Sequence, residues 1–351
     1  MPTPAADLRQ NPHKAAKNAQ LRYVSNEESG YTRIKKGRGF SYQDHDKQVV
    51  KDKALKKRFE SLVIPPNWKD VWICRDKKGH IQATGRDDKG RKQYIYHEDW
   101  LALRDQAKFD VLLPFAERLP KLRAQVKKDL QKDCLSKEHV TAAMIRLLEL
   151  SLIRVGNDSY AKENKTYGLT TLRTKHVEVK GKTLEMSFIG KSGKEHHINV
   201  EDKELAKVVK ACSELPGYRV FQYLDENGEK QTIDSSDINA YLKQHMDEAF
   251  SAKDFRTWAA SVMAASMLSE VDSETLNDEK AREKELLDVI KQVAKELGNT
   301  PAVCRDAYIH PTVQQTFLEN NLRKRLDKSK VRYKSSYLSK DEKQLLNFLA
   351  A

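Results

Sequence analysis

The sequence has few cysteines and no long apolar segment. Its four cysteines, Cys74, Cys134, Cys212 and Cys304, stand far apart in 351 residues and form no CxxC pair. This spacing argues against a zinc site and a disulfide framework, and it fits a reducing compartment. No stretch approaches the roughly 18–20 apolar residues that a membrane span needs. The first twenty residues also lack the apolar core of a secretory signal. We therefore expect a cytoplasmic protein with no membrane partner.

Several well-known catalytic motifs are also missing. The sequence has no GxxxxGK[ST], no GxGxxG between a strand and a helix, no HExxH and no GxSxG. These absences argue against an ATP-driven P-loop mechanism, a dinucleotide site, a zinc protease and an α/β-hydrolase. His196 and His197 are adjacent in a β pattern, where successive side chains point to opposite faces. We expect this pair at the surface, and we expect neither a metal site nor a nucleotide cofactor.

Positive charge is concentrated in the first third of the chain. Lysine and arginine total 64 against 51 acidic residues, for a net charge of +13. Residues 1–104 hold 14 Lys and 9 Arg against 13 acidic residues, a net charge of +10, whereas the rest carries +3 from 41 basic and 38 acidic residues. This asymmetry indicates an N-terminal part that binds a polyanion. The alternative is a surface whose charge only maintains solubility.

The length exceeds what one hydrophobic core usually supports, so two domains are expected. We expect a flexible arm over residues 1–20 and a small, mainly antiparallel β domain over residues 21–104. Gly79 and Asp88-Lys89-Gly90 are typical of hairpin turns between its strands. The expected elements are strands near residues 22–24, 31–34, 71–75, 80–84 and 91–96 and a helix over 52–62.

Helical periodicity takes over after residue 104. Apolar residues between Val140 and Val155 recur with spacings of 3, 4 and 7, which is typical of an amphipathic helix. One β-hairpin interrupts the helices, with arms over residues 171–179 and 183–200 that meet at Lys180-Gly181. Residues 105–351 should therefore form a larger, mostly α-helical domain, and the fold class is α+β. Its other predicted helices cover residues 119–130, 201–214, 234–250, 254–270, 278–297 and 302–309.

Three basic residues of this second domain stand at junctions between elements, and one tyrosine accompanies them. Arg154 ends an apolar helix, Lys191 lies in a turn bracketed by glycines, and Arg256 begins an Ala-rich helix. Tyr308 is one of thirteen tyrosines. Each has an ordinary explanation when taken singly, since basic side chains are common at helix ends and on exposed turns. Asp254 likewise could serve only as an N-cap that leaves Arg256 exposed.

The same residues acquire a chemical meaning as a group. Two arginines and a lysine around a phosphate can neutralise the charge that grows on its non-bridging oxygens. A tyrosine oxygen can then attack phosphorus and form a covalent intermediate. A protonated lysine can give its proton to the departing oxygen. This combination suits a phosphodiester transesterification without a metal.

At this point the sequence resembles a known family. Arg154-x-Gly156, residues 160–169, Gly190-Lys191, residues 253–257 and residues 298–308 are similar, in order, to the motifs of the type IB DNA topoisomerases. Residues 85–96 and Arg104 resemble the compact poxvirus and bacterial branch of that family. The resemblance covers most of residues 60–315, and its combined motifs are highly specific.

The resemblance implies catalytic roles in the helical domain. Tyr308 would attack one DNA strand, form a 3′-phosphotyrosyl bond and release a 5′-hydroxyl. Arg154 and Arg256 would hold the transition state, and Lys191 would protonate the 5′ oxygen. Family members often have a histidine nine residues before the tyrosine. Here that residue is Asn299, whose amide donates a hydrogen bond without charge.

The resemblance also implies the partner and the mode of action. The protein would act as a monomer on double-stranded DNA and relax supercoils by strand rotation, without ATP, metal or any other cofactor. The β domain and the catalytic domain would close as a clamp around the duplex, in the cytoplasm and on the nucleoid if the protein is bacterial. The residues that match DNA-contacting positions are Arg86, Arg91, Tyr94, Tyr96, Arg104, Tyr160 and Asn164.

Two alternatives remain at this stage. A tyrosine recombinase or integrase resembles the catalytic half, but it usually has a histidine three residues before the second arginine, where this chain has Lys253. Recombinases also lack the segment over residues 85–96. A catalytically silent DNA-binding protein is the other alternative, and the complete set of Arg154, Lys191, Arg256 and Tyr308 argues against it.

Overall fold

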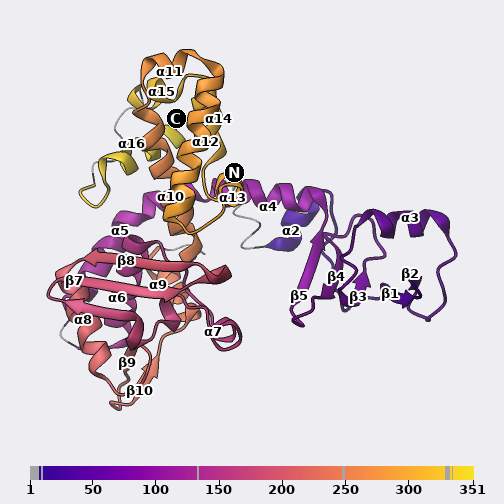
Figure 1. Ribbon diagram of the computed structural model, residues 1–351, viewed down its shortest axis with the longest axis horizontal. Coiled ribbons are helices and arrows are strands. Elements are labelled where there is room, and N and C mark those ends of the chain that lie inside the picture. Colours follow the sequence, from indigo (N-terminus) through magenta and orange to yellow (C-terminus); the bar gives the residue numbers. More distant parts are fainter. Residues whose placement is uncertain (1–7, 9–10, 133, 247–249, 329–332, 334) are drawn as a thin grey trace. The chain divides into compact units, whose positions relative to one another are not determined.

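The computed structural model describes residues 8, 11–132, 134–246, 250–328, 333 and 335–351, except for the side chains of Tyr160 and Ser273. The chain divides into two compact units, Met1–Val111 and Leu112–Ala351, which we call the N-terminal and C-terminal units (Figure 1). The boundary expected near residue 104 falls inside helix α4, Glu98–Asp110. Among the described residues, no helix is long and apolar enough to cross a membrane.

The N-terminal unit is built on a five-stranded antiparallel sheet in the order β2-β1-β3-β4-β5. Four of its strands confirm the prediction to within two residues at each end. The predicted strand at residues 22–24 is wrong, because only Arg22 forms an isolated bridge, with Gly79. The Val24 amide instead donates to the side chain of His80 at 3.0 Å, so it cannot donate to a neighbouring strand. The strands are β1 Tyr31–Lys36, β2 Gly39–Gln43, which was not predicted, β3 Lys69–Ile73, β4 Ile81–Arg86 and β5 Lys92–Tyr96.

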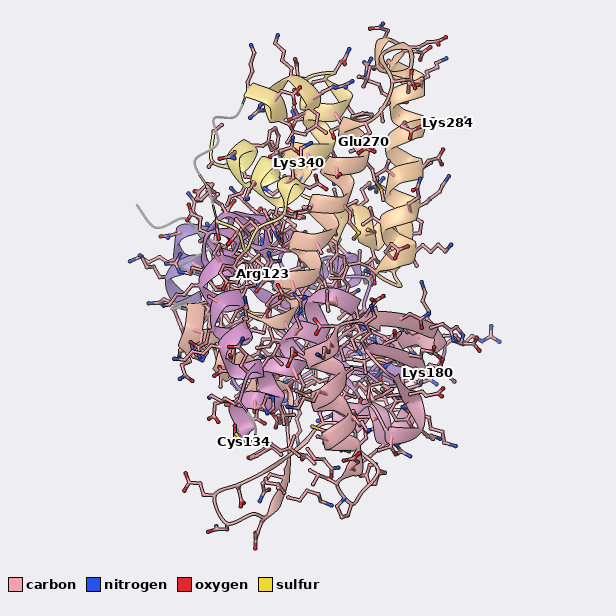
Figure 2. The ribbon with its side chains drawn as sticks, turned by 90° about the vertical axis from the view of Figure 1, so that its left-hand side faces the viewer. Arg123, Cys134, Lys180, Glu270, Lys284 and Lys340 are labelled. Carbon is pink, nitrogen blue, oxygen red and sulfur yellow. The ribbon has the colours of Figure 1, made fainter. Side chains whose placement is uncertain are left out.

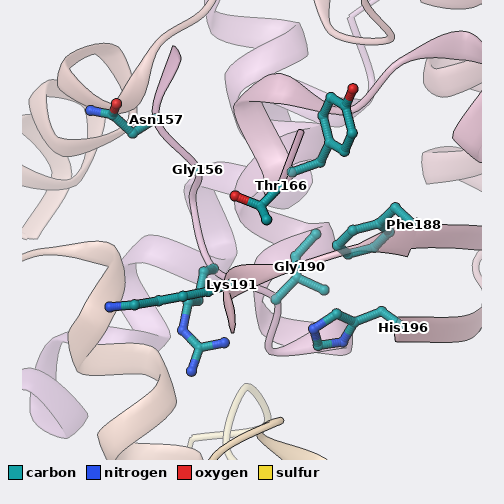
Figure 3. Close-up of a pocket in the computed structure, with 10 residues that line it drawn as sticks. Gly156, Asn157, Thr166, Phe188, Gly190, Lys191 and His196 are labelled. Carbon is teal, nitrogen blue, oxygen red and sulfur yellow. The ribbon is translucent and has the colours of Figure 1, made fainter. Parts of the chain in front are cut away.

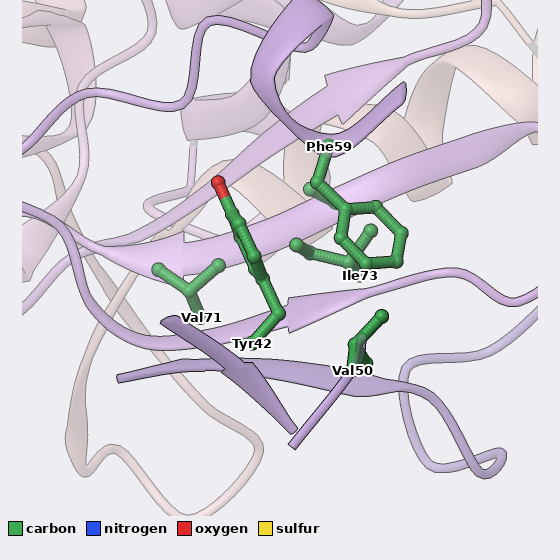
Figure 4. Close-up of a cluster of buried hydrophobic side chains, with 6 residues drawn as sticks. Tyr42, Val50, Phe59, Val71 and Ile73 are labelled. Atoms are coloured by element: carbon green, nitrogen blue, oxygen red, sulfur yellow. The ribbon is translucent and has the colours of Figure 1, made fainter. Parts of the chain in front are cut away.

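One helix and the sheet share the main core of this unit. Helix α3, Lys53–Ser61, begins where the Asp52 side chain accepts from the Ala54 amide at 2.7 Å, as expected for an N-cap. Phe59 is fully buried, with the rings of Tyr31 and Tyr42 each 4.9 Å from its centroid. Figure 4 shows this cluster, which consists of Tyr42, Val50, Phe59, Val71, Ile73 and Ala83.

Part of the expected flexible arm is a packed helix. Pro12–Asn18 forms helix α2, with Pro12 at its first position, where a missing amide proton costs nothing. Ala15 and Ala16 are buried and form a second cluster with Leu21 and Trp100. The small alanine side chains allow this close packing, and the polar composition around them conceals it in the sequence. Residues 1–7, 9 and 10 of the expected arm lie outside the described residues.

The C-terminal unit is mostly helical, as predicted. Helix α10 lies in its interior, with eleven buried residues that include Arg256 and Trp258. The hydrophobic helix expected up to Val155 ends earlier, at Ser151, because Leu152 adopts the left-handed conformation. The helices are α5 Leu112–Leu130, α6 Lys137–Ser151, α7 Asp158–Asn164, α8 Lys203–Glu214, α9 Ser235–Met246, α10 Ala252–Ser269, α11 Ser273–Asn277, α12 Glu279–Glu296, α13 Pro301–Ala307, α14 Pro311–Leu318, α15 Leu322–Lys328 and α16 Lys340–Leu349.

The predicted hairpin is a three-stranded antiparallel sheet. Its strands are β6 Val177–Lys180, β7 Thr183–Ile189 and β8 Glu195–Glu201. The arm expected over residues 183–200 is two strands, which the glycine-bracketed turn expected around Lys191 separates at Gly190–Lys194. Ser192 and Gly193 both have positive φ there, and the Gly190 amide donates to the Lys194 carbonyl at 2.7 Å. A separate hairpin of β9, Gln222–Leu224, and β10, Lys230–Thr232, was not predicted.

The end of the chain is part of the core of the C-terminal unit. Glu342 of α16 forms an ion pair with Arg123 of α5 at 2.7 Å and accepts from the Trp258 indole at 3.1 Å. Figure 2 labels Arg123 on α5 and Lys340 at the start of α16. Trp258 lies on the same helix as Arg256, so the C-terminal helix is bonded directly to the helix that carries a predicted catalytic residue.

Candidate active site

Arg154 lies in an extended segment just beyond helix α6. The backbone of Arg154 is held in place, because the Arg154 carbonyl accepts a hydrogen bond from the Leu169 amide at 2.9 Å. A Cβ on Gly168 would lie 2.5 Å from the same carbonyl, so only glycine fits there. The guanidinium donates to the side-chain oxygen of Asn299 and, at 3.5 Å, to the carbonyl of Gly298. Arg154 thus reaches a loop far away in the sequence.

Arg256 is buried near the start of α10. Its two terminal nitrogens donate to the carbonyl of Leu152 and, at 2.7 Å, to that of Leu297. These bonds join the ends of α6 and α12 to the start of α10. Burial, followed by the charge of Arg154, lowers the pKa of Arg256, whereas the Tyr308 phenol raises it. An arginine nevertheless keeps its proton in proteins, so the site holds a buried positive charge.

Asn299 lies in the loop between α12 and α13. It is buried, and its side-chain oxygen is occupied by Arg154. Its backbone carbonyl accepts from the Lys194 ammonium at 3.0 Å. The side-chain nitrogen of Asn299 and the Nε of Arg256 are buried and have no hydrogen-bond partner among the described residues. Unpaired buried donors are costly, at about 1–3 kcal/mol each.

Tyr308 follows directly after helix α13. Its backbone carbonyl accepts from Ser261 of α10 at 3.1 Å. The side chain is 9% exposed, and the Arg256 guanidinium carbon lies 5.4 Å from the ring centroid. Burial raises the pKa of Tyr308, but the positive charges of Arg256, Lys253 and Arg154 outweigh it and leave the pKa below its ordinary value. This environment favours the phenolate, which is the nucleophilic form.

Lys191 lies on the β7–β8 turn and is exposed. Together with Arg154 it lines a pocket of about 220 Å³. Figure 3 shows this pocket with Lys191, Gly190 and His196 from the β7–β8 strands and turn, and Gly156 and Asn157 from the segment after α6. The structure therefore pairs Arg154 with Asn299 and Arg256 with Tyr308, and it places Lys191 on the same pocket as Arg154.

Sequence reasoning missed two residues of this site. The expectation that the His196–His197 pair lies at the surface is wrong for His196, which is half-buried and lines the pocket, whereas His197 is exposed. Strand alternation was the available signal, because one of two neighbours in a strand must face inward. Lys194, which bonds the Asn299 carbonyl, was missed because a lysine on a turn is usually solvated.

The predicted DNA-contacting residues of the N-terminal unit gather on β4, β5 and α4. The rings of Tyr94 and Tyr96 stack at 5.7 Å, and the Arg104 guanidinium lies 5.0 Å from the Tyr96 ring. These three residues line a pocket of about 510 Å³. Arg86 and Arg91 are exposed on the β4–β5 hairpin; Arg91 pairs with Asp87 at 2.7 Å. This pairing lowers the pKa of Asp87 to about 2.

The remaining predicted contacts fall on helix α7 of the C-terminal unit. Asn164 is its last residue and is half-buried. Tyr160 lies in the same helix, but its side chain is outside the described residues. In the described part of the chain, one cluster has ligand atoms close enough for a metal ion. It consists of Asp44, His45 and Asp46 in the N-terminal unit and contains none of the candidate catalytic residues.

The chain is similar to known proteins over most of its length. Residues 92–335 match the family of the eukaryotic DNA topoisomerase I catalytic core, and residues 39–87 match the N-terminal domain of bacterial DNA topoisomerase IB. The DNA topoisomerase 1B of Acanthamoeba polyphaga mimivirus is 34% identical over 286 residues, which cover 80% of this chain and 85% of that protein. The DNA topoisomerase I of Monkeypox virus is 23% identical over 297 residues, which cover 82% and 90%.

The match to a fungal relative covers a smaller part of that relative's length. The DNA topoisomerase 1 of Mycosarcoma maydis is 25% identical over 284 residues, which cover 74% of this chain and 27% of that protein. The family match over residues 92–335 spans most of the chain and contains Arg154, Lys191, Arg256, Asn299 and Tyr308. With its matched N-terminal domain and its helical core, the chain belongs to the type IB DNA topoisomerases.

Proposed function

We propose that this topoisomerase cuts and reseals one strand of duplex DNA through Tyr308. The phenol loses its proton to solvent, and its oxygen attacks phosphorus. As the new P–O bond forms, the bond to the 5′ oxygen breaks, leaving a 3′-phosphotyrosyl end and a 5′ oxygen that takes a proton from Lys191. Supercoils relax by rotation of the free strand, and the reverse reaction reseals it. No ATP is needed, because the tyrosyl ester conserves the energy of the broken bond.

The observation that carries this proposal is a pair of buried, unpaired donors, one on Arg256, which lies against the Tyr308 ring, and one on Asn299. Arg256 Nε and Asn299 Nδ2 are buried without partners among the described residues. Such donors are stabilised by a ligand that brings oxygen acceptors, and the non-bridging oxygens of a phosphodiester are acceptors of this kind. Arg154 and Arg256 add two fixed positive charges, which would stabilise a pentacoordinate phosphorus without a metal.

Lys191 is the proposed general acid. It lies on the wall of the Arg154 pocket, so a phosphodiester held by Arg154 would bring the 5′ oxygen near its ammonium. A lysine that protonates the leaving oxygen raises the rate because an alkoxide is a poor leaving group. Tyr308, Arg154, Arg256 and Asn299 would then act on phosphorus, and Lys191 on the oxygen that departs.

Duplex DNA is the proposed substrate, bound in part by the N-terminal unit. Arg86 of β4, Arg91 of the β4–β5 turn and Arg104 of α4 supply positive charge. Tyr94 and Tyr96 of β5 present stacked rings next to it. Arginine contacts to phosphates give affinity that is independent of sequence and sensitive to salt. We propose that Tyr160 and Asn164 of α7 add contacts near the cleaved phosphate.

The two alternatives receive less support. A tyrosine recombinase would not explain the match of residues 39–87 to a topoisomerase IB N-terminal domain. A catalytically silent DNA-binding protein would not need a tyrosine buried against an arginine that lowers its pKa.

We further propose that the protein works as a monomer in the cytoplasm, where its four cysteines, all free thiols, would remain reduced.

Replacement of the nucleophile tests the proposal. Tyr308→Phe should abolish plasmid relaxation and the covalent protein–DNA adduct while leaving DNA binding nearly intact, because only one oxygen is removed. Tyr218→Phe is the matched control, since Tyr218 is 60% exposed and belongs to no part of the proposed site. Relaxation by Tyr308→Phe at the wild-type rate would refute the proposal.

A further inference from the structure

Two glycines from distant parts of the chain lie against one histidine ring. Gly190 directly precedes Lys191, and Gly298 directly precedes Asn299. A Cβ on Gly190 would lie 2.6 Å from both Cδ2 and Nε2 of His196, and one on Gly298 would lie 2.9 Å from Cε1. The His196 ring thus fills the space that side chains would occupy at both positions.

We propose that His196 is a positioning residue that holds the turn bearing Lys191 against the loop bearing Asn299 and so fixes the general acid relative to the phosphate site. This inference rests on the proposed role of Lys191. His196 takes no part in the chemical steps proposed above. Its ring acts on Lys191 and Asn299 through the backbone of Gly190 and Gly298, which lies against it.

The ring is held by packing. His196 and Phe188 are cross-strand partners in β8 and β7, and their rings stack at 5.0 Å with an angle of 15°. Phe188 is itself buried, so it provides a rigid base for the stack. No hydrogen bond to the His196 ring occurs within the described part of the chain. Its shape and position, more than a specific bond, therefore determine what it supports.

The surroundings of the ring disfavour its charged form. Arg154 faces it from the segment after α6, Arg256 from α10 and Lys194 from the turn, and His197 is its neighbour on β8. Burial, followed by the charges of Arg154 and Arg256, lowers the pKa of His196 below its ordinary value. A neutral ring can separate three cations without adding to their repulsion, so it serves as a spacer at neutral pH.

Lys191 depends on the support of its turn, because its own side chain has no bonded partner within the described residues. That side chain is exposed. The turn is tied to the Asn299 loop at two places, through the His196 ring and through the 3.0 Å bond from Lys194 to the Asn299 carbonyl. Removal of the ring would leave one tether, and a displacement of about 1 Å can slow an enzymatic step by about 100-fold.

Single-turnover cleavage of two DNA substrates tests this role. One carries the normal bridging 5′ oxygen and the other a 5′ sulfur, which departs without protonation because a thiol has a pKa of only about 8.5. His196→Ala should slow cleavage of the oxygen substrate by about 10- to 100-fold and cleave the sulfur substrate at nearly the wild-type rate. Equal slowing on both substrates, or no slowing on either, would overturn the inference.

Three further variants isolate the contact. His196→Phe keeps a flat ring in the stack and should restore most of the lost rate. Gly190→Ala places a methyl group against the His196 ring and so disturbs the same contact. It should slow cleavage of the oxygen substrate and spare the sulfur substrate, even if His196→Ala fails to fold. His197→Ala removes the adjacent exposed histidine and should cleave both substrates like the wild type. A defect in His197→Ala equal to that of His196→Ala would contradict the inference.

Lys191→Ala separates this inference from the proposed mechanism. Rescue of Lys191→Ala by sulfur supports its role as the general acid. If Lys191→Ala is rescued and His196→Ala and Gly190→Ala are not, the positioning role of His196 is wrong and the mechanism stands. If Lys191→Ala itself is not rescued, the general-acid assignment fails, and the inference about His196 fails with it.

Discussion

The guanidinium of Arg154 donates a hydrogen bond to the side-chain oxygen of Asn299. This bond determines which end of the amide is available, because the oxygen is engaged and the nitrogen is left as a buried donor without a partner among the described residues. Arg154 thereby prepares a neutral donor next to its own charge. The proposed transition state would be contacted by a pair of coupled side chains, and the pair can be tested by mutation.

Asn299→Ala should slow cleavage and religation together, by about 10- to 100-fold, because one neutral donor to a transition-state oxygen is lost. Loss of either arginine should be worse, since a full charge is removed. Asn299→Asp keeps an oxygen for Arg154 but has no N–H and adds negative charge, so it should be slower than Asn299→Ala. Single-turnover rates in both directions provide the measurement. If Asn299→Ala reacts as fast as the wild type, Asn299 serves only to order its loop.

Arg91→Ala should weaken DNA binding and reduce its salt dependence without selectively slowing chemistry. One lost phosphate contact lowers the slope of log K against log salt by about 0.9. The matched variant is Asp87→Asn, which removes the carboxylate that pairs with Arg91 at 2.7 Å. It should strengthen binding, because the arginine charge is no longer compensated. An unchanged slope in Arg91→Ala would mean that the arginine only pairs with Asp87 and does not contact the DNA backbone.

Relaxation should persist in EDTA, because Arg154, Arg256 and Lys191 supply the positive charge and the proton that a metal-bound water would otherwise provide. The assay compares plasmid relaxation with and without chelator. A magnesium-dependent nuclease in the same tube serves as the control that chelation is complete. Loss of covalent cleavage in EDTA would contradict the proposed mechanism.

Glu342→Gln should destabilise the C-terminal unit at neutral pH by about 3 kcal/mol, because Arg123 loses one of its buried charged partners. Burial raises the pKa of Glu342, but the hydrogen bonds and charge of Arg123 outweigh it and leave the pKa below its ordinary value. A depressed carboxyl pKa stabilises the fold above about pH 4.3, the unfolded value, and this contribution is lost as the pH falls further.

The difference in stability between Glu342→Gln and the wild type should therefore become smaller as the pH falls below about 4.3. Thermal unfolding across that range measures it. Asp288→Asn removes the carboxylate of an exposed ion pair with Lys291 and should leave the melting temperature unchanged. A Glu342→Gln melting curve that matches the wild type at neutral pH would show that the C-terminal helix does not depend on this ion pair.

The sequence alone was sufficient for the class of fold and for the residue types of the site. Short β patterns and turn residues predicted four of the five strands in the N-terminal sheet, because alternation and turn chemistry are local properties. Apolar periodicity predicted most helices of the C-terminal unit for the same reason. The strand expected at residues 22–24 was wrong because a side chain, that of His80, took the Val24 amide.

Only the tertiary structure could decide how these elements form a site. Arg154 and Asn299 are 145 positions apart, and their contact depends on the ends of α6 and α12 meeting the start of α10. The position of His196 in a strand could be predicted from the sequence. Its contacts with Gly190 and Gly298 could not, because these glycines come from two separate loops. Residue types and local periodicity can be read along the chain. Burial, pKa shifts and unpaired donors arise from packing between distant segments, and the proposed chemistry of the site depends on these properties.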